Sequence, residues 1–127
     1  MARAKVQIDP ATYLNELAKQ VHEANKKWWT DPATGKPIQR NRAEMLMLIV
    51  SELAEAMEGE RKDLMDDKLP HRKMAEVEIA DALIRLLDYV GGLEYDLGGA
   101  YVEKMAYNAI RKDHTAEERL KENGKKF

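Results

Sequence analysis

Two pairs of acidic residues, each with a spacing of three, interrupt two strongly apolar stretches of the chain. Glu52 and Glu55 lie within MLMLIVSELAEAM, and Glu78 and Asp81 lie within EVEIADALIRLLDYV. Residues three apart share one face of an α-helix, so each pair projects from one side. Burying unpaired carboxylates is unfavourable. A hard divalent cation such as Mg²⁺ binds oxygen ligands and often bridges to a substrate phosphate, so the pattern predicts a shared metal site.

A solvated helix edge is the structural alternative to a metal site. On a helical wheel Glu55 lies about 60° from Glu52, at the edge of the apolar face, and a single ExxE pair is common on a solvated helix edge. Two pairs on two mostly apolar helices are less expected by chance. Arg85, on the same polar stripe as the second pair, could simply neutralise it, and Asp88 could be an ordinary surface residue.

The elements that position these acids are predicted to be helices, because apolar residues recur with helical spacing and no segment alternates as a strand does. Asp9 is a plausible N-cap, with Pro10 at the first helical position, and Gly91-Gly92 is a plausible stop. The main helices are expected at 11–29, 42–59, 71–90 and 100–114, with a further helical piece at 116–121. We therefore expect an all-α, four-to-five-helix bundle forming one domain over 1–127, with 113–127 peripheral or frayed.

Composition narrows the class of protein. The 127-residue chain is 44% hydrophobic and 35% charged, with a net charge of −2 and no cysteine. This balance argues against nucleic-acid binding through bulk charge, and the lack of cysteine excludes disulfides, thiolate metal ligands and a cysteine nucleophile. No run approaches the roughly 18 apolar residues of a membrane span. We expect a soluble cytoplasmic protein without a membrane or nucleic-acid partner.

Three blocks in order resemble the MazG-like branch of the all-α nucleoside triphosphate pyrophosphatases. The pattern ExxE, a spacer, then ExxD stands here as Glu52-Leu-Ala-Glu55, 22 intervening residues, and Glu78-Ile-Ala-Asp81. The flanks SELAEAMEG and EIADALIRLLDYV also resemble the family, as does a third block, KMAYNAIRKDH at 104–114. The resemblance is good over about 40–115, whereas the N-terminal helix matches only loosely.

The resemblance implies an activity and a set of roles. The expected enzyme cleaves a (deoxy)nucleoside triphosphate between the α and β phosphates, giving the monophosphate and pyrophosphate, in nucleotide-pool control or house-cleaning. Glu52, Glu55, Glu78 and Asp81 are then the catalytic and metal ligands for Mg²⁺, which Mn²⁺ is expected to replace. Metal ions neutralise phosphate charge in such reactions, and one carboxylate, with Glu55 as our candidate, orients the attacking water.

Other residues are candidates for holding the nucleotide. The resemblance assigns phosphate or sugar contacts to Lys104 and Asn108, and Arg111 follows them on the same expected helix face. Trp28 or Trp29 is a candidate platform for stacking a base, and His22 is a candidate hydrogen-bond partner for a base. For each of these residues, core packing or a solvated face is the competing interpretation.

Assembly follows from the same wheel argument. Helices that are apolar around most of their circumference should bury more surface than a lone four-helix monomer hides. We therefore expect a homodimer or homotetramer, as the resemblance also implies. The alternative to an enzyme is a non-catalytic helical module that binds a metal or a protein partner.

Overall fold

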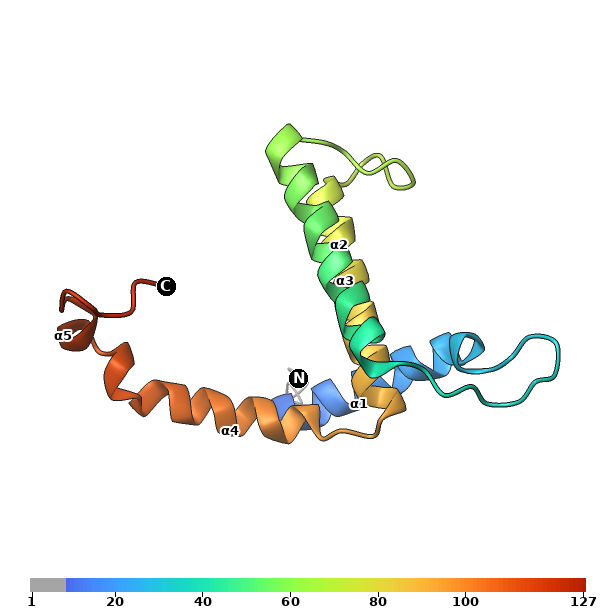
Figure 1. Ribbon diagram of the computed structural model, residues 1–127, viewed down its shortest axis with the longest axis horizontal. Coiled ribbons are helices and arrows are strands. Elements are labelled where there is room, and N and C mark those ends of the chain that lie inside the picture. The colour runs from blue at the N-terminus through green and yellow to red at the C-terminus, as the bar shows by residue number, and fades with distance from the viewer. Residues whose placement is uncertain (1–8) are drawn as a thin grey trace, which may run out of the picture. The chain divides into compact units, whose positions relative to one another are not determined.

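The computed structural model describes residues 9–127, and the regular structure in this part of the chain is helical (Figure 1). Two isolated β-bridges, Thr30 with Pro37 and Met65 with Lys73, close loops. The elements are α1 (Pro10–Asn25), η1 (Lys26–Trp29, a 3₁₀ helix), α2 (Arg42–Lys62), α3 (Met74–Gly92), α4 (Leu97–Ile110), η2 (Lys112–His114, a 3₁₀ helix) and α5 (Ala116–Arg119). The all-α prediction, with four to five helices, is confirmed.

The chain divides into two compact units. The central unit, Glu16–Tyr95, holds most of α1 together with η1, α2 and α3. Of the described residues, the terminal unit combines 9–15 with Asp96–Phe127, and so holds the start of α1 together with α4, η2 and α5. The expectation of a single domain over 1–127 stays a prediction.

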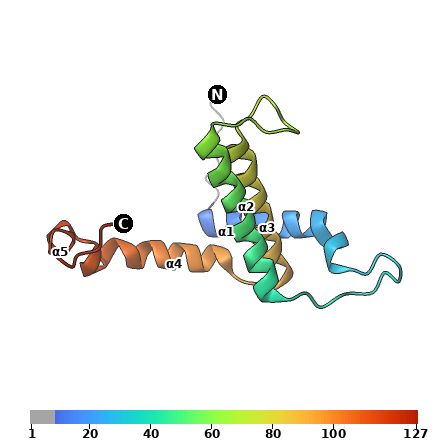
Figure 2. The ribbon, with the colours of Figure 1, turned by 45° about the horizontal axis from the view of Figure 1, so that its top comes forward.

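The two helices that carry the acidic pairs, α2 and α3, lie side by side as a hairpin in both views (Figures 1 and 2). Burying a Leu or Ile side chain contributes roughly 1.5–3 kcal/mol, so the buried residues of the hairpin hold the helices together. Those residues are mostly small or apolar, namely Met45, Ile49, Ala56 and Gly59 of α2 and Ala75, Ala82, Leu87, Asp88, Tyr89 and Val90 of α3.

The connector between α2 and α3 is built around one buried carboxylate. Asp66 is 5% exposed, and its Oδ2 accepts hydrogen bonds from the backbone N–H groups of Lys68 (2.9 Å) and Leu69 (2.7 Å). These bonds satisfy a buried charge locally, so they fix a tight turn. The length of that turn decides which residues of α2 and α3 face each other.

Helix α2 is longer than expected, and α3 starts later. The sequence predicted that α2 ends at Gly59, whereas it continues to Lys62 and ends where Asp63 adopts a left-handed conformation (φ 50°). Gly59 is buried within the helix, because a Cβ there would lie 3.0 Å from the Met74 Cβ. Helix α3 begins at Met74 rather than at His71.

The first helix starts as predicted. The Asp9 side chain accepts a hydrogen bond from the Thr12 N–H (3.2 Å), and α1 begins at Pro10. Its α-helical part ends earlier than expected, at Asn25, whose side-chain Nδ2 donates to the Val21 carbonyl (2.8 Å). The two tryptophans therefore lie in the tighter 3₁₀ helix η1 and not in α1.

The third helix ends at the Gly91-Gly92 pair, as expected, and both glycines are its last residues. A Cβ on Gly91 would lie 2.5 Å from the Ala18 carbonyl oxygen, and one on Gly92 would lie 2.5 Å from the Trp29 ring. These glycines therefore let α1 and η1 approach the backbone of α3 within the central unit. The pair thus lies at the end of the helix and also permits close approach of α1 and η1.

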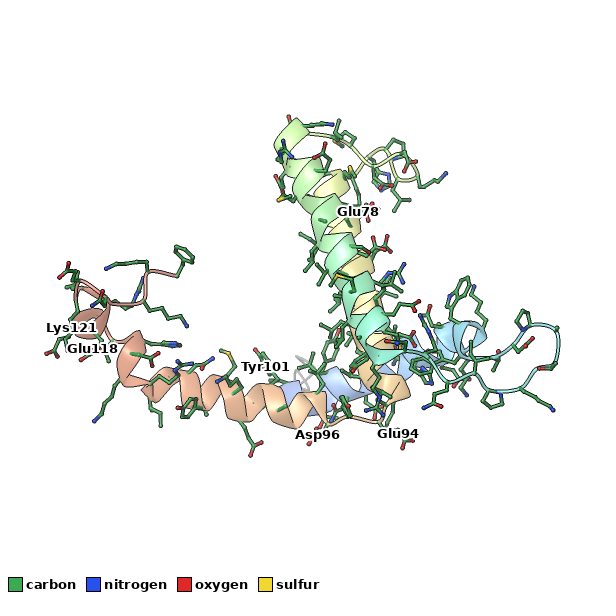
Figure 3. All side chains as sticks on the ribbon, viewed as in Figure 1. Glu78, Glu94, Asp96, Tyr101, Glu118 and Lys121 are labelled. Atoms are coloured by element: carbon green, nitrogen blue, oxygen red, sulfur yellow. The ribbon has the colours of Figure 1, made fainter. Side chains whose placement is uncertain are left out.

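In the terminal unit, α4 begins three residues earlier and ends four residues earlier than expected. Asp96, labelled in Figure 3, caps the helix by accepting the Gly99 N–H (2.8 Å). Helix α4 ends at Ile110, and the backbone of Arg111 is extended. The expected piece at 116–121 is present as the shorter helix α5.

The last residues of the chain fold back on α5. Lys126 Nζ donates to the Arg119 carbonyl at 3.0 Å, and Lys121 pairs with Glu118 at 2.6 Å (both residues of this pair are labelled in Figure 3). Across residues 9–127, no helix combines the length and the apolar character that crossing a membrane requires.

Candidate metal and ligand site

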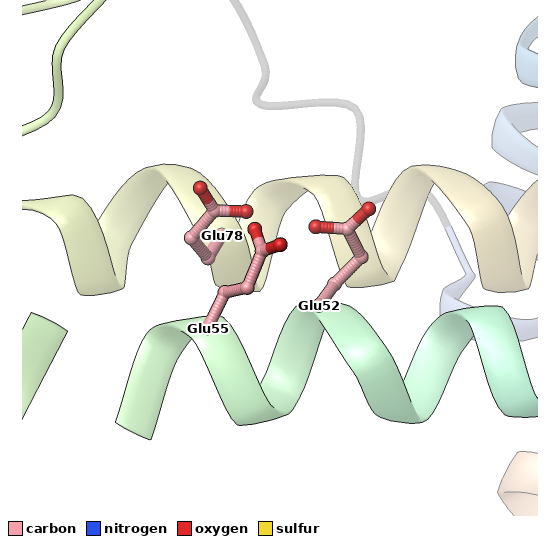
Figure 4. Close-up of side chains that lie close together, drawn as sticks. All are labelled: Glu52, Glu55 and Glu78. Atoms are coloured by element: carbon pink, nitrogen blue, oxygen red, sulfur yellow. The ribbon is translucent and has the colours of Figure 1, made fainter. Parts of the chain in front are cut away.

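Three carboxylates from two helices converge in the central unit. Glu52 and Glu55 project from α2, and Glu78 projects from α3 toward them (Figure 4). One carboxylate oxygen from each residue lies within 4.8 Å of the others. The side-by-side packing of α2 and α3 thus brings together two acids that are adjacent on one helix and one acid from 23 residues further along the chain.

The proximity of these acids changes their chemistry. Burial raises the pKa of Glu78 from 4.5 to about 8, and hydrogen bonds with Glu52 and Glu55 and their negative charges add to the effect. A carboxyl group with this pKa keeps its proton at neutral pH, which relieves the repulsion among the three acids. The same oxygens are the hard ligands that Mg²⁺ or Mn²⁺ prefers, so the donor set fits such a cation.

Within residues 9–127, one cationic side chain, Arg85, contacts the cluster. Arg85 Nε donates to Glu52 Oε1 at 2.9 Å, from the next turns of α3. The sequence interpretation had Arg85 neutralise the second pair on its own helix, whereas its ion pair is with Glu52 of α2. Toward that second pair, the charge of Arg85 lowers the pKa of Asp81 and so opposes part of the rise that burial causes. Since Arg85 is 42% exposed in its side chain and Glu52 only 13%, the guanidinium lies on the solvent side of the pair.

Asp81 lies one helical turn after Glu78 and does not belong to the group of three. Burial raises its pKa, and the charge of Glu52 is the next cause. Asp81 is therefore near enough for the charges of Glu52 and Glu55 to raise its pKa, although its oxygens are not among those that meet within 4.8 Å. It lines a cavity in which Glu52 also takes part.

That cavity has a volume of about 430 Å³, within the range of small-ligand pockets. Its walls come from α1, from the residues around the two tryptophans and from the α2–α3 hairpin, and the residues are Asn25, Trp28, Arg40, Glu52, Asp81, Ile84, Arg85 and Asp88. Most of these groups are polar or charged, with Trp28 and Ile84 as the apolar part. The cavity thus adjoins the acidic cluster through Glu52.

At the cavity wall Asp88 belongs to a buried polar network, so it is not the surface residue that the sequence allowed. Asp88 is 6% exposed. Its Oδ1 accepts from Trp29 Nε1 at 3.0 Å and lies 2.9 Å from His22 Nδ1, and the indole N–H also reaches Oδ2 at 3.1 Å. The rings of His22 and Trp29 meet edge to face with their centres 5.2 Å apart.

The three candidates for base binding, Trp28, Trp29 and His22, therefore differ in how accessible they are to a ligand. Trp29 and His22 are held by Asp88, as a packed network would hold them. Trp28 is 59% exposed and lines the cavity, which leaves one face of its ring accessible. Arg40 lines the same cavity, and its guanidinium carbon lies 5.7 Å from the centre of the Trp29 ring.

The three expected phosphate or sugar ligands lie in the terminal unit. Lys104 and Asn108 are on α4, and Lys104 Nζ lies 4.9 Å from the centre of the Tyr107 ring. Among the described residues the Asn108 Oδ1 is buried without a hydrogen-bond partner. Arg111 follows the end of α4 and binds Asp113 through two hydrogen bonds (2.9 and 2.6 Å). The expectation that Arg111 shares a helix face with the other two is wrong, because the helix has already ended.

Sequence reasoning missed Asn25 and the buried state of Asp88. One signal for Asp88 was present, since the residue stands between apolar neighbours in RLLDYV, at the end of the narrow polar stripe of α3. A carboxylate in such a position is either solvated or held by donors. The donors come from residues 59 and 66 positions away, a separation that helical periodicity does not reveal.

Comparison with known proteins yields no match: no family model, no curated protein and no solved structure is significantly similar to this chain.

Proposed function

We propose that this protein is a Mg²⁺-dependent nucleoside triphosphate pyrophosphohydrolase, which cleaves its substrate between the α and β phosphates. The observation that carries the proposal is the meeting of Glu52, Glu55 and Glu78 within 4.8 Å. The resemblance of the ExxE and ExxD blocks to the MazG-like pyrophosphatases points to the same residues, with Asp81 as a fourth ligand.

Each group would have a definite task. A bound Mg²⁺ supplies charge neutralisation at the phosphates and lowers the pKa of bound water. Glu55, the exposed member of the three acids, orients the attacking water or takes its proton. Arg85, which pairs with Glu52 and lines the cavity, is placed to bind phosphate oxygens once a cation takes over the charge of Glu52.

Nucleotide binding by the terminal unit and assembly of the chain complete the proposed enzyme. The roles of Lys104, Asn108 and Arg111 in binding phosphate or sugar come from the resemblance and from the order of the blocks. A homodimer or homotetramer is supported by apolar side chains that are exposed on the hairpin, which include Leu46 (47%), Met47 (63%), Val50 (50%), Leu53 (49%), Met57 (57%), Ile79 (53%) and Leu83 (49%). Apolar side chains exposed together on one pair of helices are typical of protein interfaces.

The decisive experiment measures pyrophosphate release from each ribonucleoside and deoxynucleoside triphosphate, with and without Mg²⁺. We expect Mg²⁺-dependent turnover that Glu52→Gln lowers by about 100-fold or more, because it removes a metal ligand. Glu58→Gln is the matched control. It lies on the same helix, where Glu58 forms exposed pairs with Arg61 and Lys62, so we expect this variant to keep wild-type activity.

The enzyme proposal predicts hydrolysis and an effect of Mg²⁺ on stability, and each can be absent. If no triphosphate is hydrolysed and Mg²⁺ does not change the melting temperature, the enzyme proposal is refuted. The exposed apolar face of the hairpin would then favour the second candidate, a non-catalytic module whose hairpin binds a protein partner. If Glu52→Gln keeps full activity, the metal site is misplaced even though the enzyme exists.

A further inference from the structure

The cavity beside the acidic cluster runs from the candidate metal ligands toward the buried Asp88. Glu52 and Asp81 lie at one end, and Asp88 lies seven residues after Asp81 on α3. At a rise of 1.5 Å per residue, the two aspartates are about 10 Å apart along the helix axis. A nucleotide whose phosphates lie at the acidic cluster extends its base over about this distance.

The far end offers a rigid hydrogen-bond acceptor. A carboxylate has about four lone-pair sites and, when ionised, only accepts. Asp88 receives two bonds at Oδ1, from Trp29 and His22, whereas its Oδ2 shares the Trp29 N–H. Acceptor capacity thus remains on a side chain that is only 9% exposed, held by two donors and part of the cavity wall.

The remaining walls suit a flat ring. Trp28 is exposed at the cavity and offers an aromatic face, on which a base can stack. Arg40 adds a planar cation, which can donate to carbonyl oxygens or ring nitrogens. A planar ligand held between these groups would present its edge, rather than its face, to the carboxylate.

Nucleobases differ in what that edge offers. Cytosine, adenine and guanine each carry an exocyclic amino group, which donates, whereas thymine carries a carbonyl oxygen where cytosine carries its amino group. Uracil shares that carbonyl, and hypoxanthine is guanine without its amino group. A carboxylate accepts a hydrogen bond from the amino group and repels a carbonyl oxygen at the same position. Asp88 would therefore select for the amino group when that position of the base lies against it.

We propose that Asp88 is a specificity-determining residue that selects nucleotides whose base carries an exocyclic amino group. This inference rests on the proposed function for the phosphate end of the cavity, and it adds the substrate class. His22 and Trp29 act as positioning residues, because they hold the carboxylate and do not themselves meet the base.

The test uses substrate pairs that differ only at the amino group, namely dCTP against dUTP and dGTP against dITP. We expect kcat/KM to be at least about tenfold higher for the amino-bearing member of at least one pair, the size of discrimination that one good base contact supplies. Equal kcat/KM values within both pairs overturn the proposal, and leave the enzyme proposal intact.

A variant and a control locate the effect. Asp88→Asn keeps the shape but adds an N–H donor, so the preference should fall at least about fivefold or reverse toward dUTP. Asp67→Asn, an exposed acid in the connector, should keep the wild-type ratio. A folded Asp88→Asn protein with an unchanged ratio overturns the assignment to this residue. If that variant does not fold, the ratios of the wild-type protein decide alone.

A binding measurement separates this inference from the catalytic proposal. Isothermal titration of dCMP, dUMP, dGMP and dIMP against the metal-free protein needs no turnover. Tighter binding of dCMP than dUMP, or of dGMP than dIMP, supports the inference even if no triphosphate is hydrolysed. Equal affinities within both pairs, or no binding at millimolar concentration, overturn it.

Discussion

Glu78 shows how neighbours decide the state of a single side chain. In sequence it is an ordinary acid next to an apolar run, but in the structure two further carboxylates share its space and burial raises its pKa to about 8. The Glu78 carboxyl group therefore keeps its proton at neutral pH in the metal-free protein. Cation binding must displace that proton, because metals bind carboxylates in the ionised form.

A pH dependence of stability follows for the metal-free protein. The pKa of Glu78 is about 8 in the folded chain, against 4.5 for an unperturbed group, so the folded state binds the proton more tightly. Its favourable contribution is complete below about pH 4.5 and is lost as the pH rises to 8. Urea unfolding in EDTA should show this fall between pH 5 and 8.

Glu78→Gln is the control for that experiment, because it cannot titrate there. The difference in unfolding free energy between the wild type and this variant should change with pH in the same window. Burial also raises the pKa of Asp81, so part of the slope should persist in the variant. A difference that stays constant from pH 5 to 8 would contradict the assignment of the slope to Glu78.

Asp88, Trp29 and His22 show what a residue-by-residue reading of the sequence can miss. The aromatic residues were identified as candidates for contacting a base, and the acid was a marginal member of the stripe on α3. The structure joins them, since both aromatic side chains lie at hydrogen-bond distance from Asp88. A buried acid is stable only with such partners, so the three must be interpreted as one group.

At the scale of elements, the hairpin of α2 and α3 carries the candidate metal site. Apolar periodicity predicted both helices, and the i, i+3 spacing correctly predicted that Glu52 and Glu55 share a face. Their boundaries were less accurate at the end of α2 and at both ends of α3. At the end of α2, Gly59 looked like a stop but packs closely against Met74, and the helix continues to Lys62. Helix α3 runs from Met74 to Gly92, so it starts three residues later and ends two residues later than expected.

Replacing Gly91 by alanine tests this view of the glycines. Alanine favours helix over glycine by about 0.8–1.0 kcal/mol, so the substitution would stabilise an exposed helical position. At Gly91 the new Cβ would lie 2.5 Å from the Ala18 carbonyl oxygen. We therefore expect Gly91→Ala to lower the free energy of unfolding by about 1–3 kcal/mol, as measured by urea denaturation. A gain in stability would contradict this expectation, because it would mean that α1 can move away from the new methyl group at little cost.

At the scale of the whole molecule, the surface of the hairpin is unusually apolar. On a helical wheel the exposed apolar residues of α2 centre about 140° from Glu52, whereas its buried residues centre near 25°. The face that carries Leu46, Val50 and Met57 is thus distinct from the one that packs on α3 and from the acids. A second copy of the chain is the occupant that we expect on this face.

The expected assembly is testable by measuring the molar mass of the protein in solution. Light scattering at micromolar concentration should give a dimer or tetramer, and a double variant, Met47→Glu with Val50→Glu, should shift it to monomer, because charges on a buried interface are unfavourable. Leu120→Glu is the control, since Leu120 is 84% exposed and lies away from the hairpin in sequence, as the C-cap of α5. A wild-type monomer would contradict the assembly.

The sequence by itself determined the helical class, the start of α1 and the pairing of acids along each helix. These properties depend on neighbours within one or two turns, and periodicity and capping residues express them directly. Only the tertiary structure decided that Glu78 and not Asp81 joins Glu52 and Glu55, that Asp88 is buried under Trp29 and His22, and that Gly91 lies inside a helix. The physical reason is that register between helices is set by contacts between distant segments. The turn held by Asp66 and the close approach at Gly59 set that register here, and neither appears in the pattern of a single helix.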